Sequence, residues 1–412
     1  MKPRWRSLYR IGSLVCAAAA VLVPSAAGQG RLVGYRTSSL GVVYENWNFS
    51  DGVTQPVWDD NGTVLIDHVS QVSFPLGVSI PVGQKWTVDL SAGYATGRVV
   101  LTGTDPELNT TRYTLNGLTD TRLRATGRLS SLISLTFGLN VPTGQTNLTP
   151  EEYSAFRVLA APALSFQVPR LGNGLSGTAG VVVSRQLSQA WAGALGVSYQ
   201  VRGKYEPGAL IAALSNPDYS PGDALRLSAG FDGLVGSNRM TLGLSADIYS
   251  TADEISDPAA GGAAITTKLG PVLSADWQLR LTVPRFRELT LYAVDRYRTR
   301  YRSGIASSGS VPVGQSSGNY LDLGARGTIA AGRGTGVLAA INFRHQTGLK
   351  ADDTIATAAM VSGGVTLGLV RELGLGYSVQ PFIRGQLGTI KSVDQSSTAT
   401  GIGGGVIVGR RF

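Results

Sequence analysis

The sequence predicts an all-β fold, a transmembrane antiparallel up-and-down β-barrel of about 16 strands, with 14 as the alternative count. Three observations lead to it: an N-terminal segment typical of export, many long segments that alternate apolar and polar residues, and short turns that alternate with longer polar loops. An even strand number, with turns on one rim and loops on the other, is typical of bacterial barrels. A closed barrel also pairs every backbone group without water, as lipid requires.

Residues 1–27 are predicted to be a cleaved secretory signal peptide. Basic residues in 1–10 precede an apolar run over 11–23, and small residues follow it. The run is shorter than the roughly 20 apolar residues that a membrane-spanning helix needs. The single cysteine, Cys16, lies inside this run, so the chain after cleavage, 28–412, is expected to have no disulfide and no thiol chemistry.

The composition excludes disorder and argues against a nucleic-acid partner. Hydrophobic residues make up 43% of the 412 residues and charged residues only 15%, whereas disordered chains are poor in hydrophobic residues. The formal charge is +9, but the basic residues are spread along the chain, whereas nucleic-acid binders gather them on one face.

Seven hairpins account for most of the predicted strands. Their segments exceed the 5–6 residues of a mean soluble strand and match the roughly 9–11 that a tilted membrane strand needs. A first strand near 41–47 and a last strand at 402–412 complete the ring. The hairpins pair 71–82 with 86–99, 118–128 with 133–141, 177–185 with 191–204, 226–234 with 240–250, 273–283 with 289–302, 321–330 with 337–346, and 361–370 with 377–389.

The alternation within these segments is regular. In 273–283, Trp277 and Leu279 fall on one face, and Asp276 and Arg280 on the other. A soluble sandwich alternates too, so the barrel prediction rests on alternation together with export signal and strand length. Aromatic residues near segment ends are expected to form two girdles at the membrane surfaces. They are Trp86, Tyr94, Trp191, Tyr199, Tyr297 and Tyr301.

The C-terminus supports the same conclusion. The chain ends at Phe412, with Val408, Val406 and Ile402 on the same face. A terminal Phe on an alternating strand resembles the recognition signal through which outer-membrane barrels meet their assembly machinery, although Arg410 departs from that pattern. We therefore expect outer-membrane lipid and the barrel-assembly machinery as partners.

Strand parity predicts a polar, net-positive lumen. Arg296, Arg298, Arg300 and Arg302, at period two, are expected on one face of one strand. Since charge on the lipid face costs about 2–4 kcal/mol at mid-depth, that face should point inward. Asp295 then falls on the lipid face, near a rim or a bulge. Parity assigns eight more residues to the pore lining: Arg122, Arg124, Arg128, Asp247, Asp276, Arg280, Arg326 and Arg344.

The longest loop, 142–175, is predicted to contain a helix. Thr149 suits the cap position and Pro150 the first turn, with the helix over 151–161. A strand over 156–168 is the rival prediction. Loops of this length in a compact domain are usually functional.

Two placements of this loop are open. It either folds inward and narrows the lumen, with Glu151, Glu152 and Arg157 at the constriction, or it rests as a lid over the outer mouth.

Catalysis is not expected. His68 and His345 are the only histidines, no G-x-S-x-G segment occurs, and no Cys/His spacing suggests zinc. We expect no cofactor and no metal.

The stretch Gly117-Leu118-Thr119-Asp120, followed by Pro142-Thr143-Gly144, carries a family resemblance. It resembles the outer-membrane transporters found with meta-pathway phenol and aromatic degradation, which commonly carry G-x-x-D before a strand and P-T-G after the next one. The motif covers roughly 117–144. The resemblance implies a barrel that takes up small organic molecules.

The expected function is passive passage of small solutes, organic or anionic, through the lumen, because rings of arginine favour anions. One alternative is a structural or adhesive barrel with a blocked lumen, in which arginines and aspartates pair to rigidify the wall. A barrel lipid hydrolase is the third.

Overall fold

The computed structural model describes residues 38–56, 63–103, 111–205, 219–249, 253–257, 263–300, 302–305, 311–312, 317–347, 358–391 and 396–410. The predicted signal peptide, Tyr301 and Phe412 lie outside these residues.

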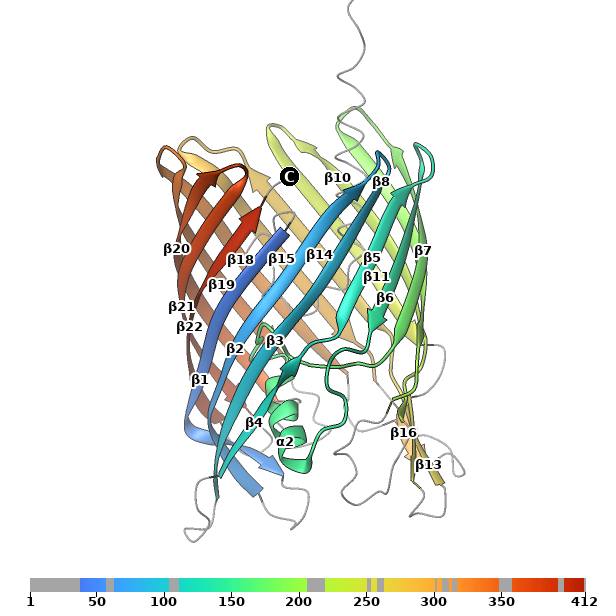
Figure 1. The fold of residues 1–412 in the computed structure, drawn as a ribbon, viewed down its shortest axis with the longest axis vertical. Coiled ribbons are helices and arrows are strands. Elements are labelled where there is room, and N and C mark those ends of the chain that lie inside the picture. The colour runs from blue at the N-terminus through green and yellow to red at the C-terminus, as the bar shows by residue number, and fades with distance from the viewer. Residues whose placement is uncertain are drawn as a thin grey trace, which may run out of the picture.

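The described strands form a closed antiparallel barrel (Figure 1). Seventeen strand segments make up the main sheet, and β22 pairs with β1 to close it. Segments β4 and β5 both pair with β3 and share one position, so the ring has 16 positions, and the predicted fold is confirmed. The segments are β1 (Ser38–Pro56), β2 (Thr63–Val82), β3 (Trp86–Gly103), β4 (Thr111–Leu118), β5 (Thr121–Arg128), β6 (Ile133–Val141), β7 (Ser176–Gln186), β8 (Trp191–Arg202), β10 (Ala224–Val235), β11 (Asn238–Tyr249), β14 (Val272–Leu281), β15 (Phe286–Arg298), β18 (Gly318–Gly332), β19 (Thr335–Gln346), β20 (Ala359–Gly374), β21 (Tyr377–Lys391) and β22 (Ser396–Arg410).

The two rims differ in their connections. Tight turns such as 83–85, 236–237 and 333–334 lie on one rim, together with the start of β1 and the end of β22. The longer connections lie on the other rim. Short turns on one rim and longer connections on the other are the arrangement typical of bacterial barrels.

A second, five-stranded sheet lies at the long-loop rim, in the three connections β8–β10, β11–β14 and β15–β18, and the sequence pattern did not predict it. Its order is β17-β16-β13-β12-β9. The bounds are β9 (Tyr219–Ser220), β12 (Asp253–Asp257), β13 (Ala263–Lys268), β16 (Arg302–Ile305) and β17 (Val311–Pro312).

The outward face of the barrel is apolar. Leu195, Ile383 and Ile402, on three separate strands, expose 67%, 67% and 65% of their surface. So many exposed apolar side chains require a nonaqueous solvent, which is the lipid of a membrane. Among the described residues, no helix is long and apolar enough to cross a membrane.

Aromatic side chains mark the two edges of this apolar band. Trp86 and Trp191 lie near the short turns, and Tyr94 and Tyr199 lie eight residues further along the same strands. Eight residues span about 26 Å along a strand, or about 20 Å along the barrel axis at a tilt of about 40°. The separation is close to the apolar height of about 25 Å known for such barrels.

The predicted strand 118–128 is interrupted. It divides at Thr119 and Asp120 into the end of β4 and the start of β5. The carbonyl of Gly93 on β3 accepts the Thr119 N–H at 2.8 Å, whereas the Asp120 N–H turns away to the Leu171 carbonyl at 2.8 Å. A backbone donor directed at a loop cannot continue the ladder, so the strand breaks there.

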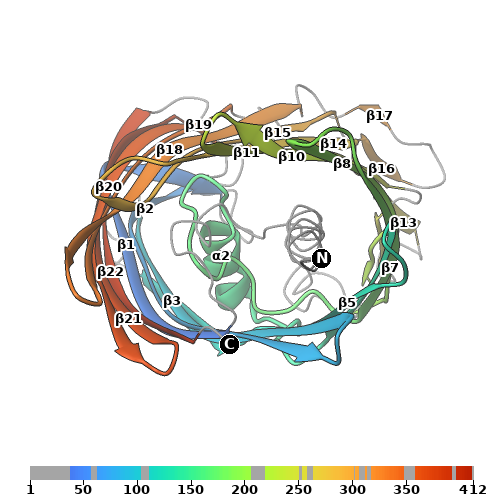
Figure 2. The same cartoon turned by 90° about the horizontal axis from the view of Figure 1, so that it is seen from above.

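The connection between β6 and β7, residues 142–175, folds into the barrel and is named the inward segment (Figure 2). It contains α2 (Pro150–Leu159), so the predicted helix is confirmed and the rival strand over 156–168 is wrong. The helix begins with a capping box, in which the Thr149 side chain accepts the Glu152 N–H and the Glu152 side chain accepts the Thr149 N–H.

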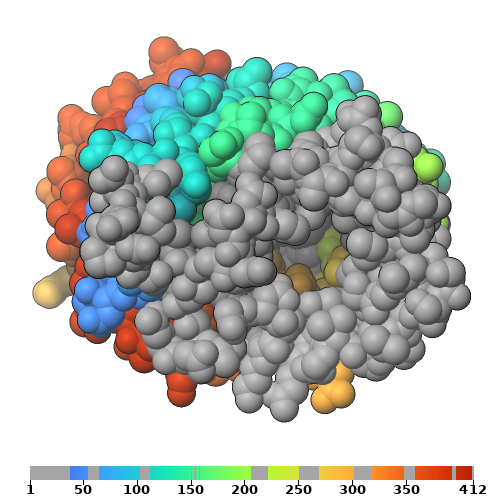
Figure 3. Space-filling view, turned by 90° about the horizontal axis from the view of Figure 1, so that it is seen from below, coloured from blue at the N-terminus to red at the C-terminus, as the bar shows by residue number. Residues whose placement is uncertain are grey.

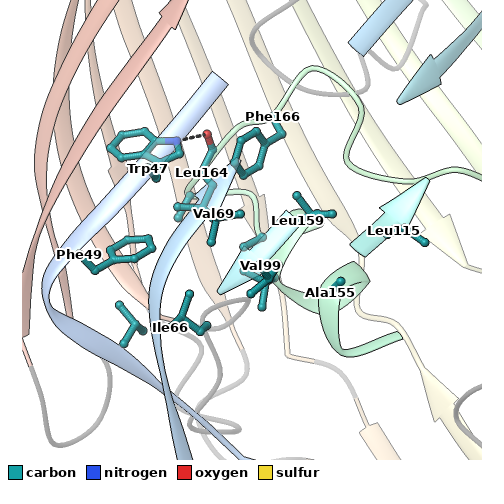
Figure 4. Close-up of a cluster of buried hydrophobic side chains, with 14 of the residues drawn as sticks. Trp47, Phe49, Ile66, Val69, Val99, Leu115, Ala155, Leu159, Leu164 and Phe166 are labelled. Atoms are coloured by element: carbon teal, nitrogen blue, oxygen red, sulfur yellow. Dashed lines mark hydrogen bonds between the residues drawn. The ribbon is translucent and has the colours of Figure 1, made fainter. Parts of the chain in front are cut away.

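The inward segment builds a hydrophobic core inside the barrel. Ala155, Val158 and Leu159 line one side of α2 and are at most 2% exposed, because residues three and four apart share a helix face. Beyond the helix, Leu164 and Phe166 are fully buried against the inner side of β1 and β2 (Figure 4). This core occupies one side of the interior and leaves space beside it.

Candidate functional site

Asp120 fastens both ends of the inward segment to the wall. Its carboxylate accepts the Asn140 Nδ2–H at 2.6 Å, the Gly144 N–H at 3.0 Å and the Asn173 N–H at 2.6 Å. Gly144 lies where the segment leaves the wall and Asn173 where it returns. Asp120 is 3% exposed, and hydrogen bonds to a buried carboxylate are among the stronger ones. We call this group the Asp120 clamp.

The P-T-G sequence completes the clamp. The Thr143 Oγ1 lies 2.9 Å from the Thr119 carbonyl and 2.8 Å from the Thr121 N–H, so it bridges the break in the wall. A Cβ on Gly144 would lie 2.2 Å from the Leu171 carbonyl oxygen, so only glycine fits between the two limbs. The two motifs on which the family resemblance rests therefore meet in one structure that folds the segment inward.

Three further side chains hold the inward segment to β1 and β2. Gln71 makes a pair of hydrogen bonds with the Val168 backbone, at 2.7 and 2.9 Å. The Glu45 carboxylate accepts the Gln167 N–H at 2.8 Å, and the Trp47 indole donates to the Leu164 carbonyl at 3.1 Å (Figure 4). Buried backbone groups need such partners, so the segment is a fixed partition.

Behind this partition lies a buried charged network. Arg384 pairs with Glu45 at 3.3 Å, and Arg344 pairs with Asp322 at 3.4 Å. All four are at most 7% exposed. Removal of one member would leave an uncompensated buried charge. Arg344, predicted to line the pore, therefore faces the interior but lies under the partition.

The space beside the partition is a cavity of about 790 Å³. It is lined by inward side chains of the strands from β3 to β15 and by Arg170, Asn173 and Tyr205. The view from the long-loop end shows atoms of the middle strands, yellow to orange, inside the ring (Figure 3). The charged lining comprises six arginines and three aspartates, a surplus of three positive charges: Arg122, Arg124, Arg170, Arg202, Arg226, Arg296, Asp89, Asp247 and Asp276.

Two ion pairs bind part of this charge to the wall. Arg124 meets Asp89 at 2.7 Å, and Arg226 meets both oxygens of Asp247 at 2.5 and 2.6 Å. The ion pairs fix the conformation of these two arginines. Since each pair removes one arginine and one aspartate, the surplus of arginines over aspartates in the lining is unchanged. The described lining of this cavity therefore combines structural ion pairs with a surplus of arginines over aspartates.

The four arginines at 296–302 do not share one strand, which corrects that prediction. Strand β15 ends at Arg298, Arg300 is in a connection, and Arg302 begins β16 in the second sheet. At the break, the Thr299 N–H and hydroxyl both approach the carbonyl of Pro271. Proline has no N–H with which to donate the reciprocal ladder hydrogen bond, so the barrel ladder ends there.

The other predicted pore residues lie at three levels. Arg122, Arg124, Asp247 and Asp276 line the cavity. Arg280 and Arg326 share Glu288, at 3.4 and 3.8 Å, nearer the short turns. Arg128 is the last residue of β5 beside a short turn. Asp295 lies on the outward face, as parity indicated, in a groove with Ala275 and Tyr297.

The inward placement of the loop is the one that the structure has, but its predicted constriction residues lie elsewhere. Glu152 closes the capping box, Glu151 is an exposed first-turn acid, and neither lines the cavity. The backbone of Arg157 is in α2, and its side chain lies outside the described residues. The residues of the inward segment that line the cavity include Arg170 and Asn173. The sequence could not identify them, because a loop has no periodicity that reports which side chains face the lumen.

The histidines do not enter the cavity. His68 Nδ1 lies 2.8 Å from Asn48 Oδ1 at an exposed position, and His345 is on the outward parity of β19, opposite Leu321. Among the described residues, no group of three or more metal-binding side chains occurs.

No protein-family model and no curated protein matches the chain. Solved structures of similar fold include OprB of Pseudomonas putida at high pH, 12% identical, covering 90% of this chain and 93% of that one with a TM-score of 0.42. A Pseudomonas aeruginosa FadL homologue is 11% identical, covering 91% and 90%, with a TM-score of 0.43. An outer membrane channel of Pseudomonas putida F1 is 12% identical, covering 92% and 97%, with a TM-score of 0.32. Identities and scores this low establish no family and no function.

Proposed function

We propose that this protein is an outer-membrane channel for passive passage of small solutes through a net-positive lumen. The observation that carries the proposal is the cavity of about 790 Å³ with its surplus of arginine, beside a fixed partition. A space of this size suits a molecule of a few hundred daltons. A positive lining raises the local concentration of anions and hinders cations.

Several finer predictions belong to this proposal. The resemblance to transporters of aromatic degradation favours small organic molecules as solutes. The proposal also includes export through a signal peptide at 1–27 that is cleaved, and insertion into outer-membrane lipid. It includes assembly through the strand that ends at Phe412. No chemistry is assigned to the protein.

The test is single-channel conductance of the purified, refolded full chain in a planar bilayer, with a salt gradient that reports ion selectivity. We expect steady conductance with anion preference. The preference should fall in Arg122→Gln and Arg296→Gln, which remove charge from the cavity lining. It should not fall in the control Arg185→Gln, whose exposed side chain lies on the outward parity of β7, beside the short turn to β8.

The same experiment decides between the two main candidates. A folded barrel without conductance would refute the channel and favour the structural or adhesive alternative. The observation that favours this alternative is the partition, which fills one side of the barrel interior (Figure 2). Cation preference would refute the role given to the arginines.

A further inference from the structure

Two arginines flank the Asp120 clamp at the cavity. Arg122 belongs to the wall, two residues after Asp120, and Arg170 belongs to the inward segment, next to Leu171. The hydrogen bond from the Asp120 N–H to the Leu171 carbonyl, at 2.8 Å, ties the two chains together. It keeps the Cα atoms of the two arginines within about 15 Å, a span that two long side chains can close around one small group.

The clamp carboxylate forms no ion pair with either guanidinium. Asp120 is buried, and its oxygens are occupied by three N–H donors. The next carboxylate along the wall, Asp89, is paired with Arg124 at 2.7 Å. The oxygens of both neighbouring carboxylates therefore already have other partners, and neither holds Arg122 or Arg170 in an ion pair.

Both guanidiniums remain available to a solute. Arg122 is exposed to the cavity and makes no ion pair within the described part of the chain. Arg170 contacts only neutral partners there, the Asn173 Oδ1 at 3.4 Å and the Phe156 ring at 5.7 Å from its centroid. A guanidinium against an aromatic face keeps its edge donors free.

We propose that Arg122 and Arg170 form a binding subsite for the carboxylate of a small organic acid, a specificity that rests on the proposed channel function. The planar fork of a guanidinium matches the two oxygens of a carboxylate. Tyr205 belongs to the same cavity lining as the two arginines, and its ring offers apolar surface to the rest of the acid. A carboxylate would thus be held where the partition meets the wall.

The subsite makes the passage selective among anions. A purely electrostatic lumen attracts every anion by charge alone. A pair of guanidiniums that bind one carboxylate also selects for its planar, two-oxygen shape. An organic acid is therefore retained longer than chloride. Both side chains lie on fixed elements, one on a strand and one on a limb held by the clamp, so the geometry is preorganised.

The test is equilibrium binding of benzoate to the detergent-solubilised full chain, measured by titration calorimetry, with benzamide as the uncharged analogue. We expect benzoate to bind and benzamide not to. Arg122→Gln and Arg170→Gln should each weaken benzoate binding about tenfold or more, as expected for loss of a charge-assisted hydrogen bond. The control Arg280→Gln removes one inward-facing positive charge away from the subsite and should change binding less than threefold.

The outcomes separate the subsite from the channel. Equal binding of benzamide, or an equal loss in Arg280→Gln and Arg122→Gln, refutes the subsite and leaves the anion-selective channel standing. A protein that binds benzoate through both arginines but conducts nothing supports the subsite and refutes the channel. Block of chloride current by benzoate that is lost in Arg170→Gln supports both.

Discussion

Replacement of Asp120 by alanine should release the inward segment without unfolding the barrel. The change removes three hydrogen bonds to a buried carboxylate, from Asn140, Gly144 and Asn173. Bonds of this kind contribute about 1.5–3 kcal/mol each. Three such bonds sum to about 4.5–9 kcal/mol, and because the freed N–H groups regain hydrogen bonds to water, we expect a loss just below this range, about 4 kcal/mol.

Hydrogen exchange followed by mass spectrometry measures this loss locally. A loss of about 4 kcal/mol corresponds to opening about a thousandfold more frequent, so amides of the inward segment should exchange about a thousandfold faster. Amides of β18 to β21, far from the clamp, should be unchanged. The matched control is Asp89→Ala, which removes another inward-facing carboxylate, one that is paired with Arg124 and does not touch the segment.

Two results would refute this reasoning. Unchanged exchange in the segment would mean that the contacts of Glu45, Trp47 and Gln71 hold it alone. Equally faster exchange in every strand would mean that Asp120 stabilises the barrel as a whole and does not act as a local clamp.

Three further predictions concern stability and charge. Gly127→Val should lower the free energy of unfolding by about 2–3 kcal/mol, because a Cβ there would lie 2.3 Å from the Trp86 ring. Denaturant titration measures this loss. In the control Gly177→Val, where a Cβ meets nothing within 4 Å, the free energy of unfolding should change by less than about 1 kcal/mol. Thr149→Ala should destabilise α2 by about 1 kcal/mol through loss of its cap, seen as faster amide exchange confined to the first turn; slower exchange would contradict it. Asp247→Asn should increase the anion preference of the conductance, since it raises the charge surplus of the cavity lining by one; a shift toward cations would show that Arg226 depends on this pair for its position.

The sequence by itself determined the architecture of the wall. Period-two alternation is a local property of an extended backbone, so it identified all 16 strand positions and the inward parity of residues such as Asp276 and Arg124. The start of α2 was equally local, because Thr149, Pro150 and Glu152 form a cap among themselves. These features need only neighbours in the chain.

Only the tertiary structure decided where the inward segment lies and what touches the cavity. Closure of the ring brings Glu45 to Arg384, 339 residues apart, and the inward fold brings Trp47 to Leu164, 117 residues apart. The break of the arginine run at Pro271 and the placement of Arg170 depend on such contacts as well. A loop has no period that reports its direction, and the partners of a buried carboxylate such as Asp120 are set by three-dimensional packing that parity does not encode.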